Sequence, residues 1–309
     1  MKQEQTINTY DDEIDIKELF IILLKNKWLV LSFTVIAAIA SVFYSLSLPN
    51  IYQSKTILVS TQSSSNSSSA MQSYSGLANL AGISLPSSSS ESNALQAIKK
   101  VNSLSFFENN VMPNIFLPDL MAVKSWSPKT NTLNLDKDIF DESKGIWTRK
   151  YTYPKKLIPS PQESFQTFKE HFSISHDMET GFVTLKVEHQ SPHIAKQWAN
   201  LVVDEINSFY REKDKSEAVK SINFLNQQIT KTNLAEVKLV IASLLQQETQ
   251  KLMLTEANEA YVYEYLDPPA VMERKSEPQR DVICIIGTFL GSLLASLIAF
   301  ARHYFFRKI

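Results

Sequence analysis

The side chains that could bind a metal or carry out catalysis are few and widely separated. His189 and His193 are four residues apart, a spacing that would bring two imidazoles together on one helical face, but Pro192 lies between them. A shared face therefore cannot be assumed. The single cysteine, Cys284, excludes an intrachain disulfide and any zinc site built from several cysteines. We predict no metal site and no cofactor.

The sequence also lacks the motifs of the common enzyme classes. It contains neither the G-x-x-x-x-G-K-[ST] loop of nucleotide hydrolases nor the G-x-S-x-G turn of serine hydrolases. Its six glycines are too few and too scattered to form a phosphate-binding loop. The 31 basic and 32 acidic residues leave a net charge of −1, which gives no general attraction to nucleic acid. We therefore expect neither an enzyme nor a nucleic-acid partner.

Two apolar segments near the ends of the chain are the clearest signals in the sequence. Residues 28–48 and 282–301 contain no charged side chain. About 20 helical residues at 1.5 Å each span roughly 30 Å, which is the thickness of the hydrocarbon core of a bilayer. We predict that both segments are transmembrane helices.

Basic residues predict the orientation of the chain in the membrane. Lys17, Lys25 and Lys27 precede the first apolar segment, whereas only Lys55 follows it closely. Positive residues favour the cytoplasmic side. The low content of cysteine and of glycosylation signals is typical of a bacterial inner-membrane protein with a periplasmic domain. The predicted division is a cytoplasmic tail (1–27), a transmembrane helix (28–48), a periplasmic domain (49–281), a second transmembrane helix (282–301) and a cytoplasmic tail (302–309).

The predicted periplasmic domain combines strands with long helices. We expect strands at 51–60, 172–175, 182–188 and 261–266, and helices at 92–109, 164–172, 193–229 and 234–256. The stretch 111–160, with five prolines, is predicted to be loop-rich, and the serine-rich residues 60–93 to be mobile at least in part. The fold class is therefore α+β, with a base formed by 49–192 and 257–267 and extended helices over 193–256.

One alternative stays open for the extended helices. The residues TKTN at 230–233 interrupt the apolar stripe and favour helix ends, so two helices joined as a hairpin are expected. The alternative is one continuous helix over 193–256, roughly 90 Å long.

Small residues and prolines near the second apolar segment are the only residues that we single out as functional. Gly287 and Gly291 form a G-x-x-x-G pattern, which lets helix backbones approach closely in lipid. Pro268, Pro269 and Pro278 lie between the last predicted strand and this segment. We expect an extended, stiff linker over 268–281 that couples the periplasmic domain to the membrane helix.

Several short motifs, taken together, resemble the Wzz-type polysaccharide co-polymerases. In chain order they are Asp12-Glu13-Ile14-Asp15-Ile16 with Leu19, Ser47-Leu48-Pro49, Tyr52-Gln53-Ser54, Glu188-His189-Gln190-Ser191-Pro192, Leu252-Met253-Leu254, Leu266-Asp267-Pro268, Lys275-Ser276-Glu277-Pro278, Gly287 and Gly291. Each motif is short, but their order covers nearly the whole chain.

The resemblance implies a homo-oligomeric ring in the bacterial inner membrane. Its implied role is to set the modal length of a lipid-linked polysaccharide, the O-antigen of lipopolysaccharide, made by a Wzy-type polymerase, without catalysing a reaction. The alternative, from another class, is a co-polymerase or export subunit for capsule or exopolysaccharide that works with a separate tyrosine kinase. A sensory receptor is a further alternative, although the eight residues after the second apolar segment leave little room for a signalling domain.

Overall fold

The computed structural model describes residues 16–61 and 90–306 and divides the chain into two compact units. One unit is formed by both ends of the chain, up to Asn50 and from Ser276, and the other by Ile51–Lys275. Most of the serine-rich segment, the acidic start of the Wzz-like motif series and the last three residues lie outside the described residues.

The terminal unit consists of helices. Its members are α1 (Ile16–Lys25), α2 (Lys27–Ser47) and α11 (Arg280–Phe306). Two segments, Lys27–Ser47 and Arg280–His303, are long and apolar enough to cross a membrane. α1 was not expected from the sequence, because it lies in the predicted N-terminal tail. It packs against α2 and α11, and it buries the side chain of Ile22.

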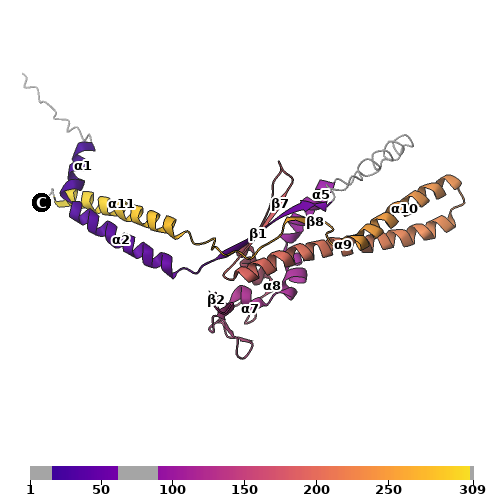
Figure 1. Cartoon of the computed structure of the whole chain (residues 1–309), viewed down its shortest axis with the longest axis horizontal. Coiled ribbons are helices and arrows are strands. Elements are labelled where there is room, and N and C mark those ends of the chain that lie inside the picture. Colours follow the sequence, from indigo (N-terminus) through magenta and orange to yellow (C-terminus); the bar gives the residue numbers. More distant parts are fainter. Residues whose placement is uncertain (1–15, 62–89, 307–309) are drawn as a thin grey trace, which may run out of the picture. The chain divides into compact units, whose positions relative to one another are not determined.

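The other unit is built around one antiparallel sheet (Figure 1). Its strands, in the order in which they lie in the sheet, are β6 (Phe172–His176), β7 (Val183–His189), β1 (Tyr52–Ser60) and β8 (Tyr263–Asp267). Two small hairpins accompany it, formed by β2 (Val123–Ser127) with β3 (Thr132–Leu135) and by β4 (Phe140–Asp141) with β5 (Ile146–Trp147).

The alternation of side chains in the sheet sets which face is buried. Thr56 lies opposite Leu185, and Ser54 lies opposite Val187, so every second residue of β1 and β7 points to the same face. All four of these side chains are buried. The two hydroxyls bind backbone carbonyls: Ser54 Oγ donates to Ala270 O at 3.0 Å, and Thr56 Oγ1 donates to Asp267 O at 2.6 Å. These bonds hold the chain that follows β8 against β1.

Helices cover the buried face of the sheet. The shorter ones are α5 (Ser90–Val101), α6 (Leu104–Phe106), the π-helix η1 (Phe107–Val111), the 3₁₀ turn η2 (Met112–Asn114), α7 (Leu117–Met121) and α8 (Pro161–His171). Phe106, Phe107, Phe168 and Trp198 are among the aromatic residues of the core between these helices and the sheet.

Two long helices complete this unit. α9 (Pro192–Lys231) has 40 residues, and α10 (Ala235–Ala257) returns alongside it (Figure 1). The structure therefore contains the helical hairpin and not the single continuous helix. The first half of α9 lies in the core, where Trp198, Val203 and Ile206 are buried. The fold class predicted from the sequence is confirmed: it is an α+β unit with a long helical hairpin between two membrane-length helices.

The stretch 111–160 is rich in loops, as expected, but it also contains short elements that the sequence analysis did not identify. This stretch contains α7 and the strands β2 to β5 as well as loops. These strands are only two to five residues long. They are too short for the period-2 alternation of side chains to stand out among prolines and lysines.

A single buried amide links α9 to the edge strand of the sheet. Asn207 Oδ1 accepts hydrogen bonds from Val262 N at 2.8 Å and from Tyr263 N at 2.9 Å, and its Nδ2 donates to Tyr263 O at 2.9 Å. The side chain is 6% exposed. The amide thus satisfies three backbone groups that water does not reach.

We predict that Asn207→Ala lowers the free energy of unfolding by about 2–4 kcal/mol, because two backbone N–H groups and a carbonyl lose their partner. Chemical denaturation of the detergent-solubilised protein measures the change. Asn200→Ala is the matched control, since Asn200 accepts only one long bond, 3.3 Å, from the partly buried Tyr265 hydroxyl. Equal stability of the two variants would contradict the role of Asn207.

Candidate functional site

The histidine pair considered in the sequence does not form a common site. His189 is 4% exposed at the end of β7. Its Nε2 lies 2.9 Å from Asp119 O, and its Nδ1 accepts a hydrogen bond from Ser191 N at 2.9 Å. These two contacts place the proton on Nε2 of a neutral ring. The exposed His193 lies near Trp126 instead, with ring centroids 6.4 Å apart and ring planes tilted by 54°.

The surroundings of His189 shift two pKa values in opposite directions. Burial lowers the pKa of His189 to about 4. Burial raises the pKa of the nearby Asp119 carboxyl to about 6, and the negative charge of Glu142 adds to this rise. The edge-to-face contact of the imidazole with Trp198, at 5.0 Å between centroids, completes an environment that keeps the ring uncharged. This is the chemistry of a structural histidine.

Among the described residues there is no group of three or more histidine, cysteine, aspartate or glutamate side chains that could hold a metal ion.

Gly287 and Gly291 lie at the contact between α11 and α2. A Cβ atom added to Gly287 would be 2.5 Å from the Cβ of Ser41, and one added to Gly291 would overlap the Cβ of Ala37. Both positions therefore have no room for a larger side chain. Gly287 meets Ser41 and Gly291 meets Ala37, so the two helices run antiparallel.

The close contact extends beyond the two glycines. Ala295 and Ala299 continue the four-residue spacing on α11, and both are fully buried. On α2 the facing residues Ala37, Ser41 and the buried Ser45 have the same spacing. We name these small residues of the two helices the small-residue seam. The sequence analysis found only its glycines, although alanine and serine at this spacing carry the same signal.

The three prolines named in the sequence lie in different surroundings. Pro269 is buried beside the sheet and Pro268 is exposed. The next residue, Ala270, accepts the hydrogen bond from Ser54. Pro278 belongs to the terminal unit, where it precedes the first residue of α11 by two positions and is half-buried. Their role in coupling the two units stays a prediction.

The helical hairpin exposes large apolar side chains. Leu239 is 72% exposed, Met253 is 64% exposed and Phe224 is 60% exposed. The side chains that join the two helices are different ones, such as the buried Ile241. Exposed apolar surface on this scale is typical of a surface that another molecule covers.

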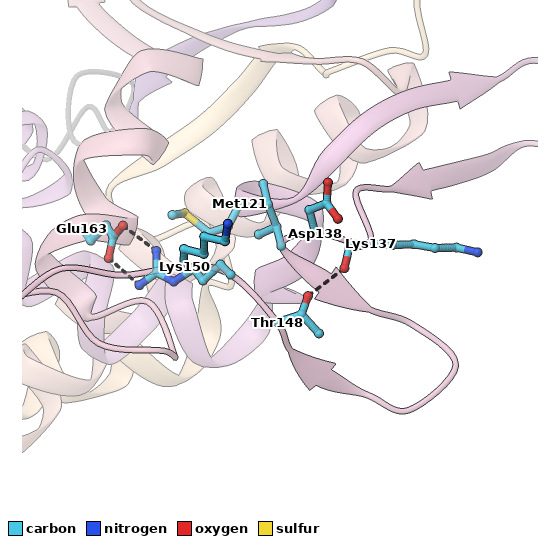
Figure 2. Close-up of a pocket in the computed structure, with 8 residues that line it drawn as sticks. Met121, Lys137, Asp138, Thr148, Lys150 and Glu163 are labelled. Atoms are coloured by element: carbon cyan, nitrogen blue, oxygen red, sulfur yellow. Dashed lines mark hydrogen bonds and ion pairs between the residues drawn. The ribbon is translucent and has the colours of Figure 1, made fainter.

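A groove of about 720 Å³ lies beside α8 and the β4–β5 hairpin (Figure 2). Its lining residues are Met121, Lys137, Asp138, Ile139, Thr148, Arg149, Lys150 and Glu163. Thr148 Oγ1 donates to Lys137 O at 2.7 Å at one end, and Glu163 lies at the other end (Figure 2). The lining is mainly charged, so the groove suits a polar ligand more than an apolar one.

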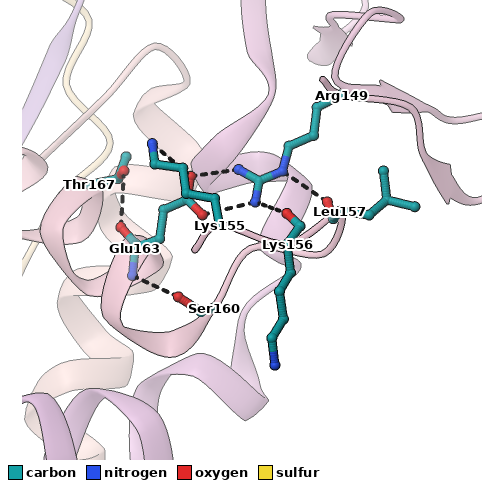
Figure 3. Close-up of polar contacts among 7 residues, drawn as sticks. All are labelled: Arg149, Lys155, Lys156, Leu157, Ser160, Glu163 and Thr167. Atoms are coloured by element: carbon teal, nitrogen blue, oxygen red, sulfur yellow. Dashed lines mark hydrogen bonds and ion pairs between the residues drawn. The ribbon is translucent and has the colours of Figure 1, made fainter. Parts of the chain in front are cut away.

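Arg149 and Glu163 form the strongest polar contact of this groove (Figure 3). Arg149 Nη1 donates to Glu163 Oε1 at 2.6 Å and Nη2 donates to Oε2 at 2.8 Å. The hydrogen bonds from Arg149 hold the pKa of the Glu163 carboxyl below its usual value. Arg149 Nε also donates to Leu157 O at 2.8 Å, and Nη2 donates to Lys156 O. Sequence reasoning did not find this pair, because the partners are 14 residues apart and belong to no motif.

A second groove, of about 650 Å³, lies between α9, the end of α10 and β8. Its acidic residues include Asp204, Glu212, Glu256 and Glu259. Burial raises the pKa of Asp204, and the negative charges of Glu205 and Glu259 raise it further. The only basic residue in its lining is Arg211, which donates to Glu259 O at 3.3 Å.

A comparison with known protein families finds a match in the first third of the chain. Residues 12–105 match the family model described as Wzz, chain length determinant protein. The resemblance to the Wzz-type co-polymerases predicted from the sequence is thereby confirmed over these residues, which include α1, α2, β1 and α5. No curated protein matches the chain.

Solved structures of polysaccharide co-polymerases are also similar to the chain. One is described as a full-length bacterial polysaccharide co-polymerase; it has 12% sequence identity and a TM-score of 0.41, with 95% of this chain and 99% of that chain covered. The other is a fragment of WzzB, a polysaccharide co-polymerase from Salmonella Typhimurium, with 12% identity and a TM-score of 0.31, covering 74% of this chain and 100% of that one. At these scores neither likeness bears on function.

We predict that Gly291→Leu separates α2 from α11, because the side chain has no space beside Ala37, and that it lowers stability by about 1–3 kcal/mol. The antiparallel register places Ser45 almost level with Cys284, so Ser45→Cys and the native cysteine can report the spacing through their rate of disulfide formation.

Ala40→Leu on the exposed side of α2 is the control for this experiment. The disulfide should form more slowly only when leucine replaces Gly291. An unchanged rate in that variant would argue against a close helix contact.

The opposite pKa shifts of His189 and Asp119 predict how stability depends on pH. When the pH falls from 6.5 to 4, unfolded His189 takes up a proton that the folded ring does not, so its contribution to stability is lost. Over nearly the same window, from about 6 to 3.8, folded Asp119 binds a proton that the unfolded chain does not, so its contribution rises. The two effects oppose each other in the native protein.

Asp119→Asn should therefore make stability fall more steeply on acidification than in the native protein, and His189→Gln should make it fall less steeply. Denaturation midpoints measured between pH 4 and pH 7 test both. His171, whose pKa is also lowered by burial, is present in all three proteins, so the differences isolate the mutated group. Parallel pH profiles would be inconsistent with the burial of the two groups.

Proposed function

We propose that the whole chain is a member of the Wzz family and sets the modal chain length of the O-antigen of lipopolysaccharide. The observation that carries this proposal is the match of residues 12–105 to the Wzz family model. The chain would act in the bacterial inner membrane as a scaffold for a Wzy-type polymerase and would not itself catalyse a reaction.

The distribution of apolar and basic residues supports the membrane topology of this proposal. Lys27–Ser47 and Arg280–His303 have the length and the hydropathy of membrane spans. Lys25 precedes the first span and Lys27 is its first residue, as is typical of the cytoplasmic end of a span. Both termini would then lie in the cytoplasm and residues 49–281 in the periplasm, with the stretch 268–281 as the link to the second span.

The exposed apolar side chains of the hairpin support self-association. In a ring of identical subunits, each copy of α9 and α10 would cover part of the surface that Leu239, Met253 and Phe224 leave exposed. The ring would present the same weak polysaccharide-binding surface many times, and repetition raises the overall affinity without strong single contacts. Length control would then follow from the geometry of the scaffold.

The small-residue seam and the three prolines would connect this scaffold to the membrane. Gly287 and Gly291 would let α11 pack closely, either on α2 or on a helix of the polymerase. Pro268, Pro269 and Pro278 would limit the bending of the chain between β8 and α11. The lipid-linked polysaccharide would thus grow beside a scaffold held at a fixed distance from the polymerase.

Deletion of the gene, followed by gel analysis of lipopolysaccharide, tests the proposed function. We expect O-antigen to be made without its modal length. Loss of all surface polysaccharide would instead identify a capsule or exopolysaccharide co-polymerase or export subunit, as would a separate tyrosine kinase bound to the cytoplasmic tails.

We predict that a shorter hairpin changes the modal length. Removal of seven residues from each helix, 222–228 and 238–244, takes out about two turns and keeps the helical phase. The gel should then show a different modal length while cross-linking still shows the oligomer. Replacing residues 232–234 by Gly-Ser-Gly, which keeps the length of both helices, is the control. An unchanged mode in an intact oligomer of the shortened protein would refute control by hairpin length.

A further inference from the structure

Residues 143–162, between β4 and the first turn of α8, carry an unusual charge pattern. They contain five basic residues and no acidic one; the basic residues are Lys144, Arg149, Lys150, Lys155 and Lys156. Aromatic and aliphatic residues alternate with them in the segment IWTRKYTYPKKLI. The rest of the chain has an excess of acidic residues, so this segment is a local positive patch.

Within this segment, residues 149–158 form a loop, and the side chain of Arg149 at its start binds the backbone near its end. Arg149 binds the carbonyl oxygens of Lys156 and Leu157, and it forms the two-pronged ion pair with Glu163 of α8 (Figure 3). The side chains of Arg149 and Glu163 are only 12% and 16% exposed. Ser160 also accepts a hydrogen bond from Glu163 N at 3.3 Å, which caps α8. The loop is therefore fixed to the base of the domain at both ends.

This tie has an electrostatic consequence for the rest of the loop. The carboxylate of Glu163 neutralises Arg149, and Asp141 pairs with Lys144 at 3.3 Å. The remaining positive charge of the segment belongs to the three lysines at 150, 155 and 156. Lys155 Nζ lies 3.5 Å from Glu163 Oε1, but its side chain is still 63% exposed. Figure 3 shows the Lys156 side chain extending away from the ion pair.

The apolar residues of the loop are exposed as well. Tyr153 is 92% exposed, Ile158 is 61% exposed and Tyr151 is 56% exposed. Tyrosine and aliphatic side chains beside lysines are the composition of segments that lie in the head-group region of a bilayer. Three lysines on a tied loop would match the negative surface of a membrane that contains anionic lipids.

The sequence keeps this domain close to such a surface. Only four residues, 48–51, separate the end of α2 from the start of β1. A bilayer crossed by α2 therefore lies within the reach of a four-residue link from the first strand of the base. Tyr52, the first residue of β1, packs edge-to-face on Trp126 of β2, with ring centroids 5.4 Å apart, which joins the β2–β3 hairpin to the same end of the sheet.

We propose that the Arg149-tied loop, residues 149–158, is a membrane-interface anchor that binds anionic phospholipid head groups. Tyr151, Tyr153 and Ile158 enter the head-group region, while the lysines pair with lipid phosphates. The contact would fix the angle of the base on the bilayer. This inference rests on the membrane insertion that belongs to the proposed function.

The test uses the full chain in nanodiscs of phosphatidylcholine, with or without phosphatidylglycerol. A Cys284→Ala background carries one new cysteine, Tyr153→Cys, labelled with an environment-sensitive fluorophore, and spin-labelled lipids serve as quenchers. Met178→Cys is the matched control, because Met178 is 88% exposed in the β6–β7 turn, and the register of β1 with β7 places this turn at the opposite end of the sheet from Tyr52. Phe43→Cys in α2 reports the insertion of the span.

We expect shallow spin labels to quench the probe at 153 more strongly than the probe at 178, and more strongly when phosphatidylglycerol is present. High salt should weaken this difference. Neutralising the three lysines, with Lys150→Gln, Lys155→Gln and Lys156→Gln together, should abolish the dependence on anionic lipid. An unchanged thermal unfolding temperature of this variant would show that the Arg149–Glu163 tie is intact.

Equal quenching at positions 153 and 178 would overturn the proposed anchor. Quenching at 153 that is the same with and without phosphatidylglycerol would also overturn it. A probe at 153 that responds to a soluble sulfated polysaccharide but not to lipid would also overturn it, in favour of an acidic glycan site. The probe at 43 distinguishes a failure of membrane insertion from a failure of the anchor alone. If deep spin labels do not quench it, the proposed membrane insertion fails; if they do and the probe at 153 stays unquenched, only the anchor fails.

Discussion

The amide of Asn207 holds together the two parts of the fold on which the rest depends. It binds three backbone groups around Val262 and Tyr263, and so fixes the edge strand β8 to the middle of α9. On one side of this point α9 is buried against the sheet; on the other it leaves the sheet and pairs with α10. The buried amide therefore helps to set the position of the hairpin relative to the base, at a junction that is also lined by charged residues.

Much of the architecture could be predicted from the sequence because its signals are periodic. The alternation of β1 and β7, with Leu58 and Val183 on the buried face, indicated strands at the right places. The apolar stripe of α9 and its interruption near Thr232 favoured a hairpin, which the structure contains. The uncharged apolar segments predicted the two membrane-length helices, and the predicted ends lie within a few residues of the ends in the structure.

The residues that sequence analysis missed act through contacts between distant parts of the chain. In the sequence, Asn207 looks like an ordinary polar residue of a helix. Its burial is explained only by the position of the backbone at Val262 and Tyr263, some 55 residues later. Arg149 and Glu163 belong to no motif, and their pairing depends on how the loop between them closes. Ala295 and Ala299 were overlooked because alanine is common in any apolar helix. Gly287 and Gly291 were noticed because they form a G-x-x-x-G pattern within an apolar segment.

The unbroken course of α9 over 40 residues has a mechanical consequence. A helix without a kink bends little over this length, so its free half and its embedded half move as one lever. A load on the turn after Lys231 would reach the strands as a rotation about the embedded half. The same helix that positions the hairpin could then report to the base, through stiffness alone, that its far end is occupied.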